Sequence, residues 1–177
     1  MTEKEVQDLI YSWENLSLIV SYMCEHPTDL ELLVKLALDD SKTTNYRSIW
    51  MVEKVHDRQP GLIVPYLPLM IEFLKQTKNS GKKRHLLKLV SLHPIAENNL
   101  AFLLDFCIGI FTNPNEEIAV RVHAMQILYN IAETEPVFAN ELIDLIENEI
   151  EYHGSAGISS RGRKLLKKLY QIRNSQN

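Results

Sequence analysis

This sequence of 177 residues lacks most of what a small secreted or membrane protein would need. Its two cysteines, Cys24 and Cys107, cannot form a disulfide framework, which suits a reducing compartment. Its longest apolar stretch, LAFLLDFCIGIF at Leu100–Phe111, is interrupted by Asp105, and a membrane-spanning helix needs about 20 apolar residues. The N-terminal segment MTEKEVQDLI is acidic and has no apolar core, so we expect no signal peptide. We therefore expect a cytoplasmic protein that does not associate with membranes.

Glycine and proline are also scarce, with six and seven residues, so the composition leaves little room for disordered segments. No stretch alternates polar and apolar residues with period two, and no strand is therefore predicted. The chain is long enough for one domain with a hydrophobic core and too short for two to be expected. The net charge of −4 argues against a dedicated nucleic-acid-binding protein, because such proteins usually carry a basic excess.

The charges that are present are segregated along the chain. Residues 122–160 contain no Lys or Arg, and residues 152–177 contain no Asp or Glu. The acidic residues of the first stretch are Glu133, Glu135, Glu141, Asp144, Glu147, Glu149 and Glu151. The basic residues that follow are Arg161, Arg163, Lys164, Lys167, Lys168 and Arg173.

An apolar pattern repeats along the chain with a step of 38 residues. Met51, Val52 and Val55 have the i, i+1, i+4 spacing of one helical face. Copies of this triplet follow at Leu89, Val90 and His93, at Ile127, Leu128 and Ile131, and at Leu165, Leu166 and Leu169. Pro60 and Pro136 lie two periods apart and predict a turn inside each repeat. The unit is therefore a helix (A), a short turn and a second helix (B).

We predict an all-α fold, a right-handed α-solenoid of antiparallel helix pairs with roughly nine or ten helices. Three pairs fill residues 44–151, with A and B helices at 44–58 and 61–76, at 83–93 and 97–112, and at 117–133 and 136–151. Residues 1–40 fit the period poorly and are predicted to form short capping helices, and a last capping helix is predicted at 160–173. Together these parts make a single domain over residues 1–177. In the third pair the predicted core residues are Ala124, Ile127, Leu128 and Ile131 on A, and Phe138, Leu142, Leu145 and Ile146 on B.

The segment AVRVHAMQIL, which opens an A helix, and the proline in the turn that follows resemble HEAT repeats. The wider pattern, with YRSIWMVEKV leading into QPGLIVPYLPLMIEFL and RGRKLLKKL near the end, resembles the HEAT-like repeats of the DNA-alkylation-repair superfamily. The resemblance covers residues 45–170 and implies architecture rather than activity. It departs from the usual HEAT pattern because Ser41, Lys78 and Asn115 replace the Asp expected before each helix Arg. An adenylosuccinate lyase activity is not supported, because GSAGISSRGRK lacks the continuation typical of that enzyme's signature loop.

No set of residues points to catalysis, to a cofactor or to a metal. The six histidines include no pair at i, i+4 and gather no second ligand type, Cys107 occupies a core position, and NSGKKRH lacks the elements of a P-loop. The resemblance implies one candidate activity, DNA glycosylase, which would use tryptophan and acidic residues such as Trp13, Trp50, Glu53 and Asp57. The alternative is that Trp50 packs between repeats while Glu53 and Asp57 face water. We predict that the protein is not an enzyme.

Two basic clusters, at 78–85 and 159–168, are candidate contacts for an anion or a nucleic-acid backbone. Ser159 or Ser160 would cap the last helix and leave backbone N–H groups beside the second cluster, an arrangement that binds anions. Alternatively, the positive charge of this helix complements the acidic helix predicted at 136–151. The candidate contacts are Lys82, Lys83, Arg84, Arg161, Arg163 and Lys164.

The B helices are expected to line a concave surface that suits a partner. Its candidate contacts are Tyr66, Asn99, Asp105, Asn140 and Asp144. The leading prediction is a non-enzymatic scaffold for an unknown protein or peptide, because solenoids supply extended binding surfaces. The alternative is a nucleic-acid-binding protein of the alkylation-repair type, which would use both basic clusters and Arg47. The acidic third B helix argues against it, because it would repel phosphates.

Overall fold

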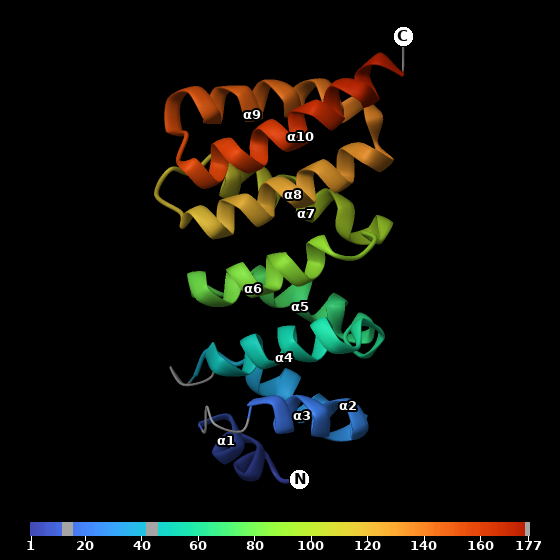
Figure 1. Ribbon diagram of the computed structural model, residues 1–177, viewed down its shortest axis with the longest axis vertical. Coiled ribbons are helices and arrows are strands. Elements are labelled where there is room, and N and C mark those ends of the chain that lie inside the picture. The colour runs from blue at the N-terminus through green and yellow to red at the C-terminus, as the bar shows by residue number, and fades with distance from the viewer. Residues whose placement is uncertain (12–15, 42–45, 176–177) are drawn as a thin grey trace. The chain divides into compact units, whose positions relative to one another are not determined.

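The computed structural model describes residues 1–11, 16–41 and 46–175, and Figure 1 shows their helices in sequence order. Within these ranges every regular element is helical, as the apolar pattern predicts. The elements are α1 (Glu3–Tyr11), α2 (Leu16–Glu25), α3 (Pro27–Ala37), α4 (Tyr46–Arg58), η3 (Pro60–Leu62), η4 (Val64–Tyr66), α5 (Leu67–Leu74), α6 (Ser80–Ser91), α7 (Glu97–Phe111), α8 (Ile118–Thr134), η5 (Pro136–Phe138), α9 (Ala139–His153) and α10 (Ala156–Asn174). The chain forms two compact units, Met1–Leu89 and Val90–Asn177.

In the first unit, α4 packs against α2 and α3, and α1 packs against α3. The short helices predicted before residue 40 are present as α1, α2 and α3. Apolar residues about one turn apart on α3 and α4 are buried: Leu30, Leu33, Val34, Ile49, Val52 and Val55. Burial of each such side chain contributes roughly 1.5–3 kcal/mol, so this shared face stabilises the packing of α3 against α4. Trp13 lies outside the described residues.

The first B helix differs from the prediction. Residues 61–76 were expected to form one helix, but the chain makes the short 3₁₀ helices η3 and η4 and then the eight-residue α5. The cause is the spacing of Pro60, Pro65 and Pro68, each of which lies in the first turn of one of these elements. A proline inside a continuous helix removes a hydrogen-bond donor and clashes with the preceding turn, so the helix restarts at each one.

The second unit is built around α8, which packs against α7, α9 and α10 (Figure 1). The predicted core residues of α8 are buried: Ala124, Ile127, Leu128 and Ile131. On the B side Leu142 and Ile146 are buried, while Phe138 and Leu145 are half-buried. The opposing faces of the third repeat therefore pack largely as predicted.

Glycines occupy two crowded positions, one at the end of α9 and one on α10. A Cβ on Gly154, at the end of α9, would lie 2.2 Å from the Ile150 carbonyl oxygen. A Cβ on Gly162 would lie 2.9 Å from the Ile150 side chain and 3.0 Å from that of Ile146. Real side chains do not make contacts this short, so α10 can approach α9 this closely because position 162 has no Cβ.

Candidate functional site

The first unit buries a carboxylate between α4 and α6. Glu53 is only 6% exposed, and its oxygens lie 2.5 Å from His85 Nδ1 and 2.5 Å from Lys88 Nζ. Burial by itself would raise the pKa of Glu53, but the hydrogen bonds from His85 and Lys88 outweigh it and lower this pKa to about 2. The prediction that Glu53 faces water is therefore wrong, and its carboxylate is committed to two partners from α6. Asp57 is exposed, as predicted, and pairs with Lys54 at 2.8 Å.

The tautomer of His85 follows from its neighbours. The nitrogen Nη2 of Arg84 lies 3.1 Å from His85 Nε2. Because a guanidinium can only donate, Nε2 is the acceptor and Nδ1 carries the proton that is donated to Glu53. Arg84, a predicted anion contact, therefore already has a partner in His85.

The second unit buries a different ionic contact, between α8 and α9. Arg121 and Glu149 are 3% and 7% exposed and form a direct ion pair. Arg121 Nε also donates to the Phe111 carbonyl at 2.9 Å, and this satisfies one of the last carbonyls of α7, which have no partner within the helix. His153 Nδ1 lies 3.2 Å from the same Glu149 carboxylate. The contact joins three helices.

Lys82 does not lie where an anion could reach it. Its side chain is 1% exposed, and Nζ donates to the Asp39 carbonyl at 2.6 Å and pairs with Asp40 at 2.9 Å. The same nitrogen lies 5.3 Å from the centre of the Phe73 ring. The assignment of Lys82 to a phosphate contact is therefore wrong, because this lysine joins segments inside the first unit. Lys83 is half-buried.

The second basic cluster is exposed but lies away from the helix end. Ser155, rather than Ser159 or Ser160, caps α10, because its side chain accepts from the Ile158 N–H at 3.3 Å. The first four N–H groups of α10 therefore precede Arg161, and the predicted anion site beside them is wrong. Arg161 is half-buried, and the exposed basic residues of this helix are Arg163, Lys164, Lys167 and Lys168, which we call the α10 basic face.

The α10 basic face is not used for ion pairing with its neighbour. Among the described residues no ion pair joins α9 to α10. The two helices are joined instead by the contact at Gly162 and by a hydrogen bond from Tyr170 to Glu147. The alternative that the positive charge of α10 neutralises the acidic helix α9 is therefore not supported by any ion pair in the described part of the chain.

The predicted partner contacts on the B helices are mostly accessible. Asp105 on α7 and Asn140 and Asp144 on α9 are exposed, whereas Tyr66 and Asn99 are half-buried. Asn140 and Asp144 belong to a larger set on α9, which we call the α9 acidic face. It consists of the exposed residues Asn140, Glu141, Asp144, Glu147, Asn148 and Glu151.

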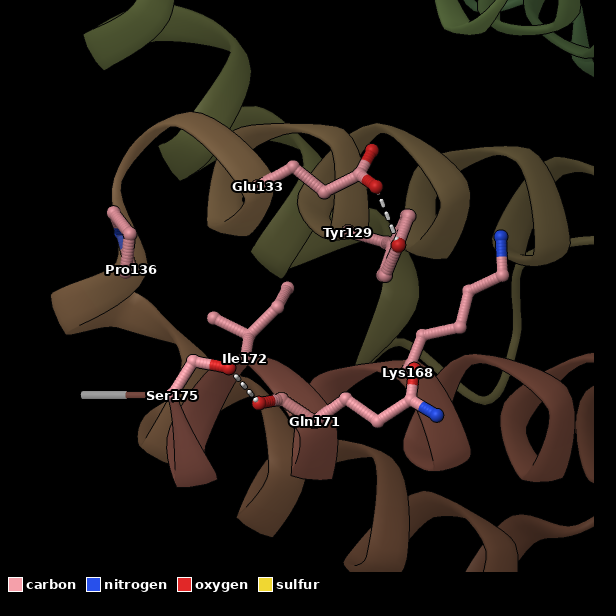
Figure 2. Close-up of a pocket in the computed structure, with 7 residues that line it drawn as sticks. All are labelled: Tyr129, Glu133, Pro136, Lys168, Gln171, Ile172 and Ser175. Carbon is pink, nitrogen blue, oxygen red and sulfur yellow. Dashed lines mark hydrogen bonds between the residues drawn. The ribbon is translucent and has the colours of Figure 1, made fainter. Parts of the chain in front are cut away.

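Two pockets border the C-terminal end of α8. The larger, of about 560 Å³, lies between α8 and α10 and is shown in Figure 2. In it the Tyr129 hydroxyl donates to Glu133 Oε1 at 2.5 Å, and Lys168 Nζ lies 5.2 Å from the centre of the Tyr129 ring. Burial, together with the bond to Glu133, raises the pKa of Tyr129, so its hydroxyl remains a donor. The smaller pocket, of about 310 Å³, is lined by Ser91, Leu92, His93, Pro94, Ile95, Asn130, Glu133 and Thr134.

Sequence reasoning did not find the buried pairs or the pockets. Glu53 and His85 are separated by 32 residues, and Arg121 and Glu149 by 28, so no local motif marks either pair. Cys107 is buried as predicted, and burial raises the pKa of its thiol, which disfavours the reactive thiolate. In the described residues no helix combines the length and apolar character that crossing a membrane requires.

Comparison with known proteins identifies the architecture. A family model described as HEAT repeat domain matches residues 7–169. No curated protein and no solved structure matches the chain. The match confirms the HEAT part of the resemblance and the all-α solenoid fold, whereas the likeness to the alkylation-repair superfamily is not shown by it.

Proposed function

The chain belongs to the HEAT repeat domain family, and we propose that it is a non-enzymatic scaffold that binds a protein or peptide on its B helices. Repeats of this kind commonly mediate protein interactions, because stacked helix pairs offer one long surface formed by successive units. The carboxylates buried inside the two units are committed to neighbouring side chains. The groups left for a partner are therefore those on the surface.

The observation that carries this proposal is the α9 acidic face. Its residues recur at intervals of three and four, so they lie along one side of the helix. Glu149, on the other side, is buried against Arg121, which shows how differently the two sides are used. A surface of carboxylates and amides is complementary to a partner that carries Lys or Arg, and such complementarity chiefly speeds association and selects partners.

The test is a quantitative affinity capture from a lysate of the source cells. The full-length chain is compared with a Glu141→Lys, Asp144→Lys variant and with a matched α10 variant, Arg163→Glu, Lys167→Glu. We expect recovery of a specific partner to fall by at least about tenfold with the α9 variant, because like charges then face each other. Recovery with the α10 variant should be retained. Equal recovery with all three chains would refute a partner site on α9.

A second function is favoured by the α10 basic face. Arg163, Lys164 and Lys167 are exposed, and they form no ion pair with a described carboxylate. Such a surface can contact nucleic-acid phosphates, and this is the alternative in which the chain acts as a nucleic-acid-binding protein of the alkylation-repair type.

Fluorescence anisotropy with labelled duplex and single-stranded DNA tests this second function. Binding should weaken steeply with salt, and should be lost when Arg163, Lys164 and Lys167 are changed to Ala. Lys35→Ala, which changes an exposed lysine on α3, is the control and should bind normally. Absence of binding at low salt would exclude the alternative.

A further inference from the structure

The C-terminal end of α8 carries negative charge that no basic residue of its last turn balances. The last carbonyls of a helix lack partners within it and act as a partial negative charge. Many helices place Lys, Arg or His there, but the last turn of α8 has none. Instead, Glu133 and Glu135 are both exposed at this end, so their negative charges add to the partial negative charge of the helix end.

The smaller pocket opens at this helix end and has fixed walls. One wall is the segment 91–95 and the other is the end of α8. Asn130 Nδ2 donates to the Ser91 carbonyl at 2.8 Å, which ties one wall to the other. Asn130 Oδ1 in turn accepts from Gln126 at 2.8 Å, so the amide is held in one orientation.

Glu133 is the carboxylate of this pocket, and it too is held in place. Its Oε1 accepts the Tyr129 hydroxyl at 2.5 Å, an interaction drawn in Figure 2. No Lys or Arg lines the smaller pocket, and His93 is its other titratable residue. The nearby Lys168 lines the larger pocket, with its ammonium over the Tyr129 ring. The smaller pocket therefore holds the carboxylate of Glu133 in a fixed position, and no Lys or Arg in its lining neutralises that charge.

Three residues of the segment 91–95 give the pocket an apolar part. These are Leu92, Pro94 and Ile95, and Leu92 is 53% exposed, so its side chain is accessible to a ligand. A ligand that fits must supply a cation for Glu133 and apolar groups beside it.

We propose that the smaller pocket binds the side chain of an arginine or lysine from a partner peptide whose neighbouring residues are apolar. The cation lies at Glu133 and the α8 carbonyl end, and the apolar residues cover Leu92, Pro94 and Ile95. The inference rests on the proposed scaffold function, in that the ligand belongs to a protein, but it places the contact at a surface separate from the α9 acidic face. Charge complementarity decides for a basic peptide over an acidic one.

The experiment is a titration of the full-length, isotopically labelled chain, followed by amide chemical shifts. The probes are three peptides, acetyl-Leu-Arg-Leu-amide, its norleucine counterpart acetyl-Leu-Nle-Leu-amide and the acidic acetyl-Leu-Glu-Leu-amide. We expect the arginine peptide to shift amides in 91–95 and 130–134, and to bind at least about fivefold more tightly than the norleucine peptide, as one partly exposed charge contact allows. Glu133→Gln should reduce arginine-peptide binding by about the same factor. Gln keeps an oxygen that can accept from Tyr129, so the fold should be unaffected.

Glu31→Gln, at an exposed carboxylate of α3 outside both proposed binding surfaces, is the matched control and should leave peptide binding unchanged. Equal affinity for the arginine and norleucine peptides, preference for the acidic peptide, or no shift in these segments up to about 10 mM peptide would each overturn the proposal. The scaffold function is tested separately by the Glu141→Lys, Asp144→Lys variant. Loss of cellular partners with that variant, combined with a negative peptide titration, would refute this pocket and leave the scaffold function intact.

Discussion

The two compact units each bury a carboxylate, but they neutralise it in different ways. In the first, Glu53 accepts from the imidazole of His85 and from Lys88, whose side chain is 33% exposed. In the second, Glu149 pairs with Arg121, whose side chain is 4% exposed. The guanidinium of Arg121 is charged at every pH a protein meets and is buried, whereas the ammonium of Lys88 is partly exposed, so solvent screens its attraction for Glu53. We therefore expect the strength of the ion pair between Arg121 and Glu149 to vary little with solution conditions, and that of the contacts of Glu53 to vary more.

The largest effect is expected from Arg121→Met. The change leaves Glu149 buried without its cation and removes the donor to the Phe111 carbonyl. Breaking a buried pair in this way should lower the free energy of unfolding by about 3–5 kcal/mol, measured by urea denaturation. The double change Arg121→Met, Glu149→Leu should recover much of this loss, because no buried charge is then left unpaired. A double variant as unstable as the single one would show that the cost is not one of an unpaired charge.

The next effect is a dependence on pH in the first unit. The pKa of Glu53 in the folded chain, about 2, is below its ordinary value of 4.5, so folding favours the ionised form. The resulting stability, about 3 kcal/mol, is present above pH 4.5 and is lost as the pH falls towards 2. Urea denaturation of the native chain and of Glu53→Gln across this range should show the slope in the native chain and much less of it in the variant. Glu141→Gln, at an exposed carboxylate, is the control, and parallel curves for all three chains would contradict the assignment.

A smaller effect is expected from replacing the two histidines that contact these carboxylates, and the loss of stability should differ between them. His85→Phe preserves a ring but removes the Nδ1 donor from buried Glu53, and should cost about 1–3 kcal/mol of unfolding free energy. His153→Phe should cost less than about 0.5 kcal/mol, because Glu149 keeps Arg121 and His153 is largely exposed. Denaturant midpoints of the two variants give the comparison directly. Equal losses would mean that His153 is as important to Glu149 as His85 is to Glu53.

The sequence predicted the fold well where packing is local and periodic. The buried face of α8, with Ala124 and Ile131, follows from its spacing alone, because a helix places such residues on one side. The start of α10 was predicted four residues late, since Ser155 and Ser159 are both acceptable caps and only the tertiary structure chooses between them. The interruption of the first B helix was missed, although Pro65 and Pro68 are a local signal that could have shown it.

The candidate site was less predictable, for a different physical reason. A charged residue on a helix is usually exposed unless a partner neutralises it, so Glu53 was expected to face water and Lys82 to contact an anion. Their partners, His85 and Asp40, lie 32 and 42 positions away and cannot be found by spacing along one helix. Asp144 was a candidate partner contact whose exposure the sequence did not decide, and the structure places it at the surface.

The smallest expected effect tests how much of the first contact depends on Lys88. Lys88→Met should lower the free energy of unfolding by about 0.5–1 kcal/mol, less than His85→Phe, because the ammonium is partly screened by solvent. Lys35→Met, which removes the exposed pair with Glu31, should change the denaturant midpoint by less again. If Lys88→Met instead costs as much as His85→Phe, the ammonium and the imidazole contribute equally to the stability of buried Glu53. The contact of Glu53 would then resemble the ion pair of Arg121 and Glu149, in which a permanent cation neutralises the carboxylate.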